Sequence, residues 1–256
     1  MNRNRLQRVS LSLLIGALVP AICIDLNSSY SASLGTRETK DADFVLRVKN
    51  WNDFERIKEV FAKHGFEKRE HEVEQRLFFG NAVIDLLPYG AELLDGNCIE
   101  WPVSGKRIDV RGFDQVFLFA EKRELVPGFK IPTIPLWLSV VLKMGAYLDR
   151  GYRRDVIDIL YILEHVEESG EQSRRFDVIA DGITYETSGA FLIGRDIRQH
   201  GSERVIPLVK SFLSLIDDAY AKPIQEILRE ERRISSNERR QHLHNLFLFL
   251  KKGLEV

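Results

Sequence analysis

Two aspartates separated by one residue, Asp41 and Asp43, stand at the start of a strand-like segment that ends near Val48. Successive side chains of a strand point to opposite faces, so both carboxylates project from one face while Ala42 and Phe44 face the other way. Neighbouring carboxylates repel one another unless a cation lies between them, and Asp is depleted in strands. Mg²⁺ commonly uses one or two carboxylates together with substrate phosphates. The pair therefore indicates either a divalent-metal site or a solvated strand edge with two charges.

A third acid interrupts an apolar run further along the chain. Residues 72–79 and 82–87 are predicted strands joined by a hairpin turn at Gly80-Asn81, and the second strand contains Asp85. Burial of an unpaired carboxylate costs on the order of several kcal/mol. A metal ion or a cationic side chain is therefore expected next to Asp85.

The composition is typical of a soluble globular protein, with 44% apolar and 29% charged residues in a chain of 256. This length accommodates one large or two ordinary domains. The net charge of −1 creates no overall field that would recruit nucleic acid or an anionic membrane. Cys23 and Cys98 have no metal-binding or redox spacing and suggest a reducing compartment, with a single disulfide as the alternative. The six histidines show no zinc-type spacing.

The first 30 residues admit two interpretations. A basic start, an apolar run and the small residues at 31–33 resemble a secretory signal peptide with its cleavage site. Gly16 and Pro20 interrupt the apolar run, which is short for a membrane span. We favour a folded interpretation, in which a strand over residues 11–15 turns at Gly16 into a helix that ends near Leu26.

The remaining elements divide the chain into a strand-rich part and a helical part. A proline-punctuated connector from Pro127 to Pro135 separates them, which predicts an α/β domain over residues 1–130 and a helical domain over residues 131–256. The other predicted elements are a helix from an Asn52 N-cap to His64, strands at 98–103, 107–110 and 115–121, and helices at 136–148, from Arg153, at 187–199, at 204–219 and within 224–250.

Charged side chains recur at helical spacing after the connector. Lys143, Tyr147 and Arg150 lie three or four residues apart and hence on one face. Asp155 and Asp158 share a face of the next helix. Ordinary helix chemistry also explains the aspartates, because an acid near a helix N-terminus is stabilised by the helix dipole.

The order of these motifs resembles the nucleotidyltransferase superfamily of the DNA polymerase β type, in which a glycine-led turn precedes an Asp-x-Asp strand and a third acid on a neighbouring strand. In the same order, this chain has Gly16-Ala17, Arg37-x-Thr39-x-Asp41-x-Asp43 and Ile84-Asp85-Leu86. Two later motifs narrow the resemblance to the AbiEii/AbiGii-type toxin nucleotidyltransferases over about residues 9–165; they are Lys143-x-x-Ala146 and Arg154-Asp155-x-x-Asp158. The resemblance implies an α+β fold, with a nucleotidyltransferase-type mixed sheet flanked by helices and followed by a C-terminal helical bundle.

The resemblance also implies a reaction, the transfer of a nucleoside monophosphate from a nucleoside triphosphate to a hydroxyl acceptor. Asp41, Asp43 and Asp85 would hold two Mg²⁺ or Mn²⁺ ions. Lys143 would contact phosphate from the second domain, so that the active site would lie in the cleft between the domains. Asp155 would belong to the same site, either touching the nucleotide or orienting Lys143.

The nucleotide itself would be contacted by residues near the N-terminus. The resemblance assigns this role to the turn at Gly16 and Ala17 and to Arg37 and Thr39. Many members have Gly-Gly or Gly-Ser followed by a serine at this turn, so Ala17 removes a hydroxyl that could contact the triphosphate. A catalytically weak or inactive module that binds a nucleotide or a partner is therefore the alternative to an active enzyme.

The resemblance further implies a cytoplasmic protein that is the toxin of a toxin-antitoxin pair, with a cognate antitoxin and no membrane association. The acceptor could be tRNA, another RNA or a protein hydroxyl. A run of alternating charges at residues 229–240 is either an RNA-binding patch or, more commonly for such runs, a solvated helix face.

Overall fold

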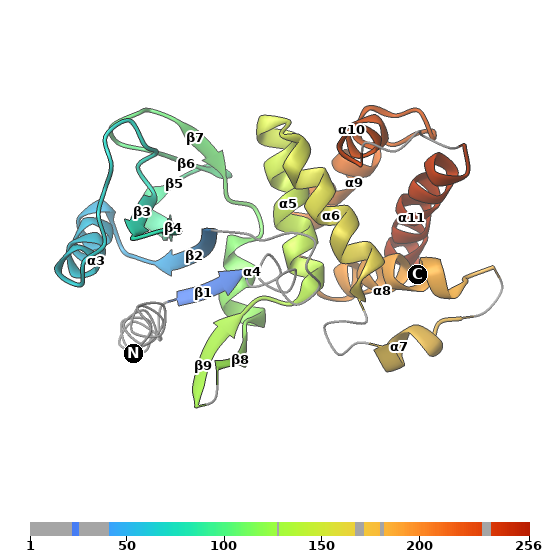
Figure 1. Ribbon diagram of the computed structural model, residues 1–256, viewed down its shortest axis with the longest axis horizontal. Helices are drawn as coiled ribbons and strands as arrows, with labels where there is room; N and C mark the ends of the chain where they lie inside the picture. The colour runs from blue at the N-terminus through green and yellow to red at the C-terminus, as the bar shows by residue number, and fades with distance from the viewer. Residues whose placement is uncertain (1–21, 26–40, 127, 167–171, 180–181, 232–236) are drawn as a thin grey trace. The chain divides into compact units, whose positions relative to one another are not determined.

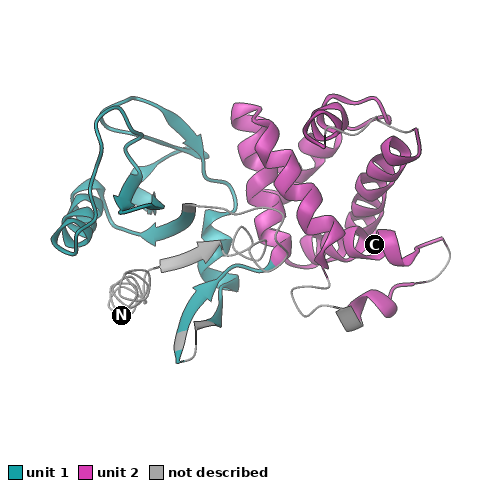
Figure 2. Cartoon of the chain, in the orientation of Figure 1, with its two compact units in different colours: residues 1–135 teal, residues 136–256 magenta. Residues whose placement is uncertain are grey.

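The computed structural model divides into two compact units, residues 1–135 and residues 136–256 (Figure 2). The division follows Pro135, the last proline of the connector. Among the described residues, unit 1 contains all the strands and unit 2 contains helices only. The structure describes residues 22–25, 41–126, 128–166, 172–179, 182–231 and 237–256.

Unit 1 is built on a mixed sheet (Figure 1), which has six strands within the described residues. β2 runs parallel to β4 and β1 runs parallel to β9, whereas the other neighbouring strands are antiparallel. In sheet order the strands are β3 (Arg76–Phe79), β4 (Ala82–Tyr89), β2 (Asp41–Arg47), β1 (Ile22–Asp25), β9 (Phe129–Thr133) and β8 (Glu121–Val126).

Buried apolar residues occupy every second position of β2 and β4, as expected for a sheet that is covered on one face. Phe44 and Leu46 on β2 and Ile84 and Leu86 on β4 are each at most 1% exposed, and they share the face opposite to that of Asp43 and Asp85. The predicted hairpin is confirmed, because β3 and β4 are joined by a two-residue turn at Gly80-Asn81. Gly80 has a φ of 59°, which is readily adopted by a glycine.

Helix α3 (Trp51–Lys63) confirms the predicted helix but not its predicted cap. Asn50 is the N-cap, and its side-chain oxygen accepts a hydrogen bond from the backbone N–H of Asp53 at 3.1 Å. The Asn52 assignment is therefore wrong by two residues. Phe66, which follows the helix, contacts the rings of both Phe61 and Phe79 and so joins α3 to β3.

A second, smaller sheet follows β4. The short helix η3 (Ala91–Leu93) leads into it. Its three strands within the described residues include the pair predicted around Ser104-Gly105. They are antiparallel and run in the order β5 (Leu94–Asp95), β6 (Cys98–Glu100) and β7 (Arg107–Asp109).

Two predicted elements of unit 1 are wrong. The segment predicted as a strand at 115–121 is mostly helix α4 (Phe113–Phe119), because an apolar run of that length does not separate helix from strand. Packing decides for the helix, since the rings of Phe113 and Phe117 both contact Tyr89 of β4. The helix predicted to reach Leu26 is contradicted by β1, which pairs with β2. The predicted strand at 11–15 lies outside the described residues.

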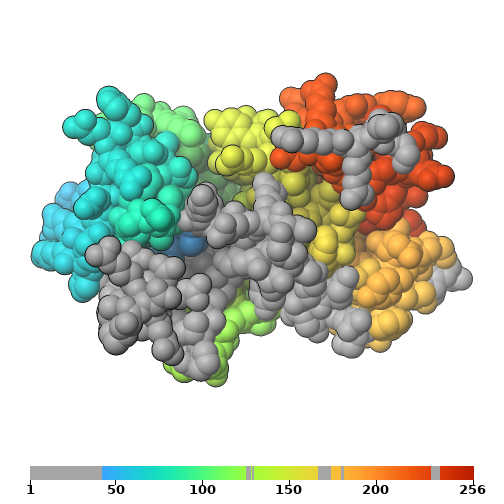
Figure 3. All heavy atoms as spheres, in the orientation of Figure 1, coloured from blue at the N-terminus to red at the C-terminus, as the bar shows by residue number. Residues whose placement is uncertain are grey.

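Unit 2 confirms the predicted helices, with some changes at their ends. α5 packs against α6, α8 and α9, and α8 packs against α11. The side chains of α10 and α11 lie together on the face of this unit seen in Figure 3. No helix within the described ranges is long and apolar enough to cross a membrane. The helices are α5 (Leu136–Arg150), α6 (Arg153–Glu164), α7 (Gln172–Phe176), α8 (Tyr185–His200), α9 (Val205–Leu213), α10 (Lys222–Glu230) and α11 (Asn237–Glu255).

Candidate active site

The sheet brings two of the three predicted acids of unit 1 into direct register. Asp43 on β2 is the direct register partner of Asp85 on the parallel strand β4, and Asp25 at the end of β1 is its partner on the other side. Neighbouring strands lie about 4.8 Å apart, and directly paired residues project from the same face. Asp43 and Asp85 are therefore adjacent acids on one face of the sheet. Asp41 lies two residues earlier on β2.

Asp85 has a cationic partner that the sequence analysis did not identify. Arg76 of β3 is its register partner in the hairpin. The arginine donates two hydrogen bonds to the carboxylate, from Nε to Oδ1 at 2.8 Å and from Nη2 to Oδ2 at 2.7 Å. The Asp85 side chain is 12% exposed and that of Arg76 is 29% exposed. The expectation of a cation next to Asp85 is thus met by a side chain of the same hairpin.

Several predicted site residues fall outside what the structure describes. Gly16, Ala17, Arg37 and Thr39 all lie in undescribed segments, and the side chain of Asp41 is also undescribed. Among the side chains that are described, no three His, Cys, Asp or Glu groups converge so that they could hold a metal ion.

Comparison with known families identifies the chain. A family model described as "Nucleotidyl transferase AbiEii toxin, Type IV TA system" matches residues 31–230. The chain belongs to this family. The match includes Asp41, Asp43, Asp85, Lys143 and Asp155, and it confirms the resemblance inferred from the motifs.

Other comparisons add little to the AbiEii assignment. No curated protein matched the sequence. Among solved structures, the chain is similar to the CdnE cyclic dinucleotide synthase of Elizabethkingia meningoseptica, determined with GTP and Apcpp. The identity is 13% and the TM-score is 0.26, with 99% of this chain and 92% of that chain covered.

Unit 2 of this AbiEii-family chain contains the two later motifs, which form ion pairs between α5 and α6. Lys143 Nζ lies 3.0 Å from Asp158 Oδ2. Arg150 binds Asp155 through Nε to Oδ2 at 2.9 Å and Nη2 to Oδ1 at 2.6 Å, and the Asp155 side chain is only 1% exposed. Within unit 2, Asp155 is therefore held by Arg150, and Lys143 is held by the other aspartate of the motif.

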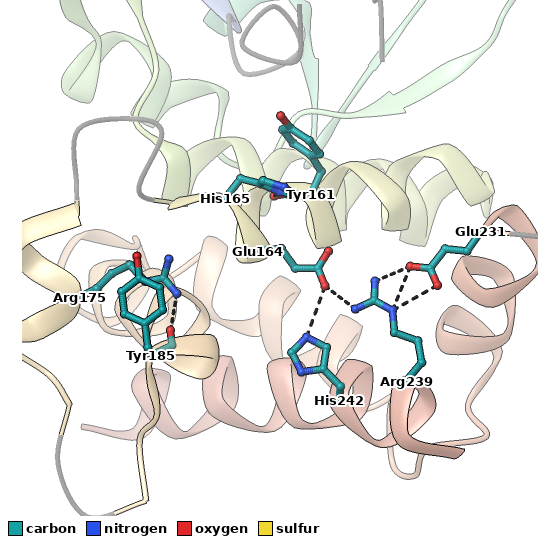
Figure 4. Close-up of polar contacts among 8 residues, drawn as sticks. All are labelled: Tyr161, Glu164, His165, Arg175, Tyr185, Glu231, Arg239 and His242. Carbon is teal, nitrogen blue, oxygen red and sulfur yellow. Dashed lines mark hydrogen bonds and ion pairs between the residues drawn. The ribbon is translucent and has the colours of Figure 1, made fainter. Parts of the chain in front are cut away.

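A further charged cluster in unit 2 joins three helices (Figure 4). Glu164 at the end of α6 accepts a hydrogen bond from Arg239 Nη1 at 2.6 Å and lies 3.4 Å from Nε2 of His242. Arg239 also binds Glu231, just after α10. Burial raises the pKa of Glu164, but His242 and Arg239 outweigh it and lower that pKa to about 2. Arg239 of the predicted RNA patch is thus engaged within the protein.

A hollow of about 970 Å³ lies at the other end of the parallel strands. Arg47 of β2 and Tyr89 of β4 line it together with residues of α3 and α4. Each is four residues, or about 13 Å, along its strand from Asp43 or Asp85. This hollow is therefore separate from the row of acids.

Proposed function

We propose that the chain is a metal-dependent nucleotidyltransferase that moves a nucleoside monophosphate from a nucleoside triphosphate to a hydroxyl acceptor. The observation that carries this proposal is the register pairing of Asp43 with Asp85. It puts the third acid beside the Asp-x-Asp strand, in a chain that belongs to the AbiEii nucleotidyltransferase family. Membership of that family alone supports the reaction class, and the pairing supports the assignment of these residues.

The chemistry of the three acids fits a divalent metal. Asp41, Asp43 and Asp85 offer oxygen ligands only, which suit Mg²⁺ or Mn²⁺. Bound metal would stabilise the charge that develops on the attacking and leaving oxygens. The chain's own contribution is to fix two of the carboxylates on adjacent strands, where their backbone positions are set by the ladder.

Other residues of the proposed site would bind the nucleotide. Arg37 and Thr39 precede Asp41 in the sequence and are proposed phosphate contacts, as is the backbone at Gly16 and Ala17. The helix predicted to follow that turn is replaced by β1 at residues 22–25, so the support for Gly16 and Ala17 is weaker than for the acids.

Unit 2 would supply two further active-site residues. Lys143 is a proposed phosphate contact, because its ammonium group is a point charge. Asp155, in the next motif, is proposed as a residue of the same active site. Both have ion-pair partners within unit 2. Their proposed roles require either that Lys143 and Asp155 leave these partners for the substrate or that the ion pairs orient the two charged groups.

The biological role proposed is that of a cytoplasmic toxin paired with an antitoxin protein. The family description, a type IV toxin-antitoxin system, supports this role. The acceptor is proposed to be an RNA such as tRNA, with a protein hydroxyl as the second possibility.

The reaction is tested by incubating the purified protein with each of the labelled nucleoside triphosphates, Mg²⁺ or Mn²⁺, and total tRNA. Label should pass to the acceptor with the wild-type protein and be lost in Asp41→Ala and Asp43→Ala. Asp95→Asn is a matched control, since that aspartate is 71% exposed and lies on β5 of the same unit. Absence of transfer with every triphosphate and acceptor, or transfer that persists in both alanine variants, would overturn the proposal.

A second candidate function is a nucleotide-binding or partner-binding module without turnover. The Arg76–Asp85 pair favours it, because the arginine compensates the charge of Asp85 without a metal. The same assay separates the two functions when nucleotide binding is measured in parallel. Binding of a triphosphate without transfer to any acceptor would support the module.

A further inference from the structure

The hydrogen bonds between Arg76 and Asp85 occupy a group that the proposed reaction needs. Both carboxylate oxygens of Asp85 accept from the guanidinium, in the two-point geometry of the strongest arginine–carboxylate pairs. The pair joins adjacent strands at matching register positions, so the hairpin itself holds the two side chains together. Asp43 lies on the other side of Asp85. Asp85 thus stands between a cationic side chain and a second acid.

We propose that Arg76 is the resident counter-ion of Asp85 and that a divalent metal must displace it to bind at the acids. This inference rests on the proposed function, because it assumes that Asp85 is a metal ligand. Arg76 is then a positioning residue of the site. It keeps the protein stable without metal and weakens the binding of metal in the absence of nucleotide.

The competition between Arg76 and the metal is one of charge. A carboxylate has about four lone-pair sites, so a two-point arginine contact does not by itself fill every coordination position. A guanidinium and a divalent cation on the same carboxylate, however, repel one another strongly at a separation of a few Å in a largely buried setting. Asp85 therefore cannot bind the guanidinium and the metal ion at full strength at the same time. Binding of the metal therefore favours states in which Arg76 has left Asp85.

The surroundings give Arg76 a way to leave. Its side chain is 29% exposed, and it belongs to β3, the last strand on one side of the sheet as far as the structure describes it. Glu72 offers an alternative partner, since its Oε2 lies 3.9 Å from Nη1 of Arg76 and its side chain is 38% exposed. Asp85 is on an inner strand and is only 12% exposed. The arginine is therefore the partner that moves.

The same unit offers a matched control pair. Arg111 binds Asp109 at the end of β7 through two hydrogen bonds from Nε and one from Nη2. The side-chain exposures are 24% for the arginine and 14% for the aspartate, close to those of Arg76 and Asp85. Removing either arginine charge leaves a similarly buried aspartate without its cationic partner, although Asp109 keeps a hydrogen bond from the backbone N–H of residue 111 at 2.9 Å. Only the loss at Arg76 should be compensated by a metal.

The test measures thermal unfolding and Mn²⁺ binding of the full chain without nucleotide. Arg76→Gln and Arg111→Gln should both lower the melting temperature in the absence of metal. Saturating Mn²⁺ should restore Arg76→Gln but not Arg111→Gln, and titration calorimetry should give a Kd for Mn²⁺ that is roughly tenfold lower in Arg76→Gln than in the wild type. Arg76→Lys, which keeps the charge but loses the two-point contact, should show a smaller shift of the same sign and serves if the glutamine variant does not fold.

The double variant Arg76→Gln, Asp85→Asn assigns the effect to Asp85. The gain in Mn²⁺ affinity should disappear in this background, as expected for two residues that act through one contact. A gain that persists there, or an equal response of the Arg76 and Arg111 variants to Mn²⁺, would overturn the inference. Wild-type transfer activity with an unchanged Kd for Mn²⁺ in Arg76→Gln would overturn this inference alone. Absence of Mn²⁺ binding in every variant, even with nucleotide, would overturn the proposed function together with it.

Discussion

Asp43 and Asp85 are direct register partners on the parallel strands β2 and β4, 42 positions apart in the sequence. In a parallel ladder this pairing depends on the whole connection between the strands, which here contains helix α3 and strand β3. The two carboxylates therefore share one face only when unit 1 is folded. The ladder, rather than a flexible loop, determines their separation.

Asp43→Asn should lower the rate of nucleotidyl transfer by at least about 100-fold if the proposed function holds, because it removes a proposed metal ligand beside Asp85 while it keeps the shape of the side chain. The initial rate of label transfer to the acceptor measures the effect. The melting temperature should stay within a few degrees of that of the wild type, since Asp43 is only half-buried. A folded Asp43→Asn protein that retains full activity would remove Asp43 from the site.

The hairpin that carries Asp85 could be predicted in more detail than it was. A two-residue turn at Gly80-Asn81 pairs Phe79 with Ala82 and, three steps further, Arg76 with Asp85. The arginine partner was therefore contained in the turn position and the alternation of the strands. A cation next to Asp85 is expected from its burial alone, and the hairpin register names that cation as Arg76.

Other features depend on contacts that a local pattern does not contain. The sequence predicts a strand where the structure has helix α4, and a helix where the structure has strand β1. Both short apolar stretches fit either helix or strand. Aromatic contacts with Tyr89 favour the helix in α4, and pairing with β2 favours the strand in β1. The longer helices of unit 2 are predictable because each shows an apolar stripe. Helix α7, with five residues, is too short to show one, and the sequence predicts no helix there.

Removing the arginine and removing the aspartate of the Arg150–Asp155 pair should destabilise the protein by different amounts. Arg150→Ala leaves Asp155, which is 1% exposed, without its charge partner and should cost about 2 kcal/mol of unfolding free energy. Asp155→Asn should cost less, about 1 kcal/mol, because the Arg150 side chain is 43% exposed and can turn to water. Urea unfolding of both variants measures the difference, and an equal or reversed order would contradict it.

Activity measurements on the same pair test the proposed role of Asp155. Asp155→Asn should abolish transfer in protein that is still folded, whereas Arg150→Ala should retain part of it after correction for the folded fraction. If both variants keep wild-type activity per folded molecule, Asp155 acts only in the packing of α5 and α6.

The Glu164 cluster predicts a stability change in acid. The pKa of Glu164 is about 2 in the folded protein and 4.5 in the ordinary state of the side chain. A lowered pKa stabilises the folded state above about pH 4.5, and this contribution is lost as the pH falls from there towards 2. The contribution is on the order of 3 kcal/mol.

Glu164→Gln removes the titrating group and so serves as its control. The unfolding free energy of the wild type should fall more steeply between about pH 5 and about pH 2 than that of Glu164→Gln, as measured by urea unfolding across that interval. The two curves should converge at the acid end. Parallel curves would show that the contacts of Glu164 with Arg239 and His242 contribute no pH dependence.

Substitution by alanine should change the free energy of unfolding by very different amounts at two glycines of unit 2. A Cβ atom on Gly194 of α8 would overlap the backbone carbonyl oxygen of Leu250 on α11, so the two helices would have to separate. We expect Gly194→Ala to cost at least about 3 kcal/mol. A Cβ on Gly145 of α5 would meet only the Cδ1 atom of Leu208 at 3.2 Å, which is the flexible end of a side chain.

The Gly145→Ala variant is therefore the matched control. Alanine favours a helix over glycine by about 1 kcal/mol, which offsets the small adjustment required of Leu208, so this variant should stay within about 1 kcal/mol of the wild type. Urea unfolding of the full chain followed by circular dichroism compares the two. Equal stability of the two variants would mean that α8 and α11 separate without loss and that their close backbone contact does not stabilise unit 2.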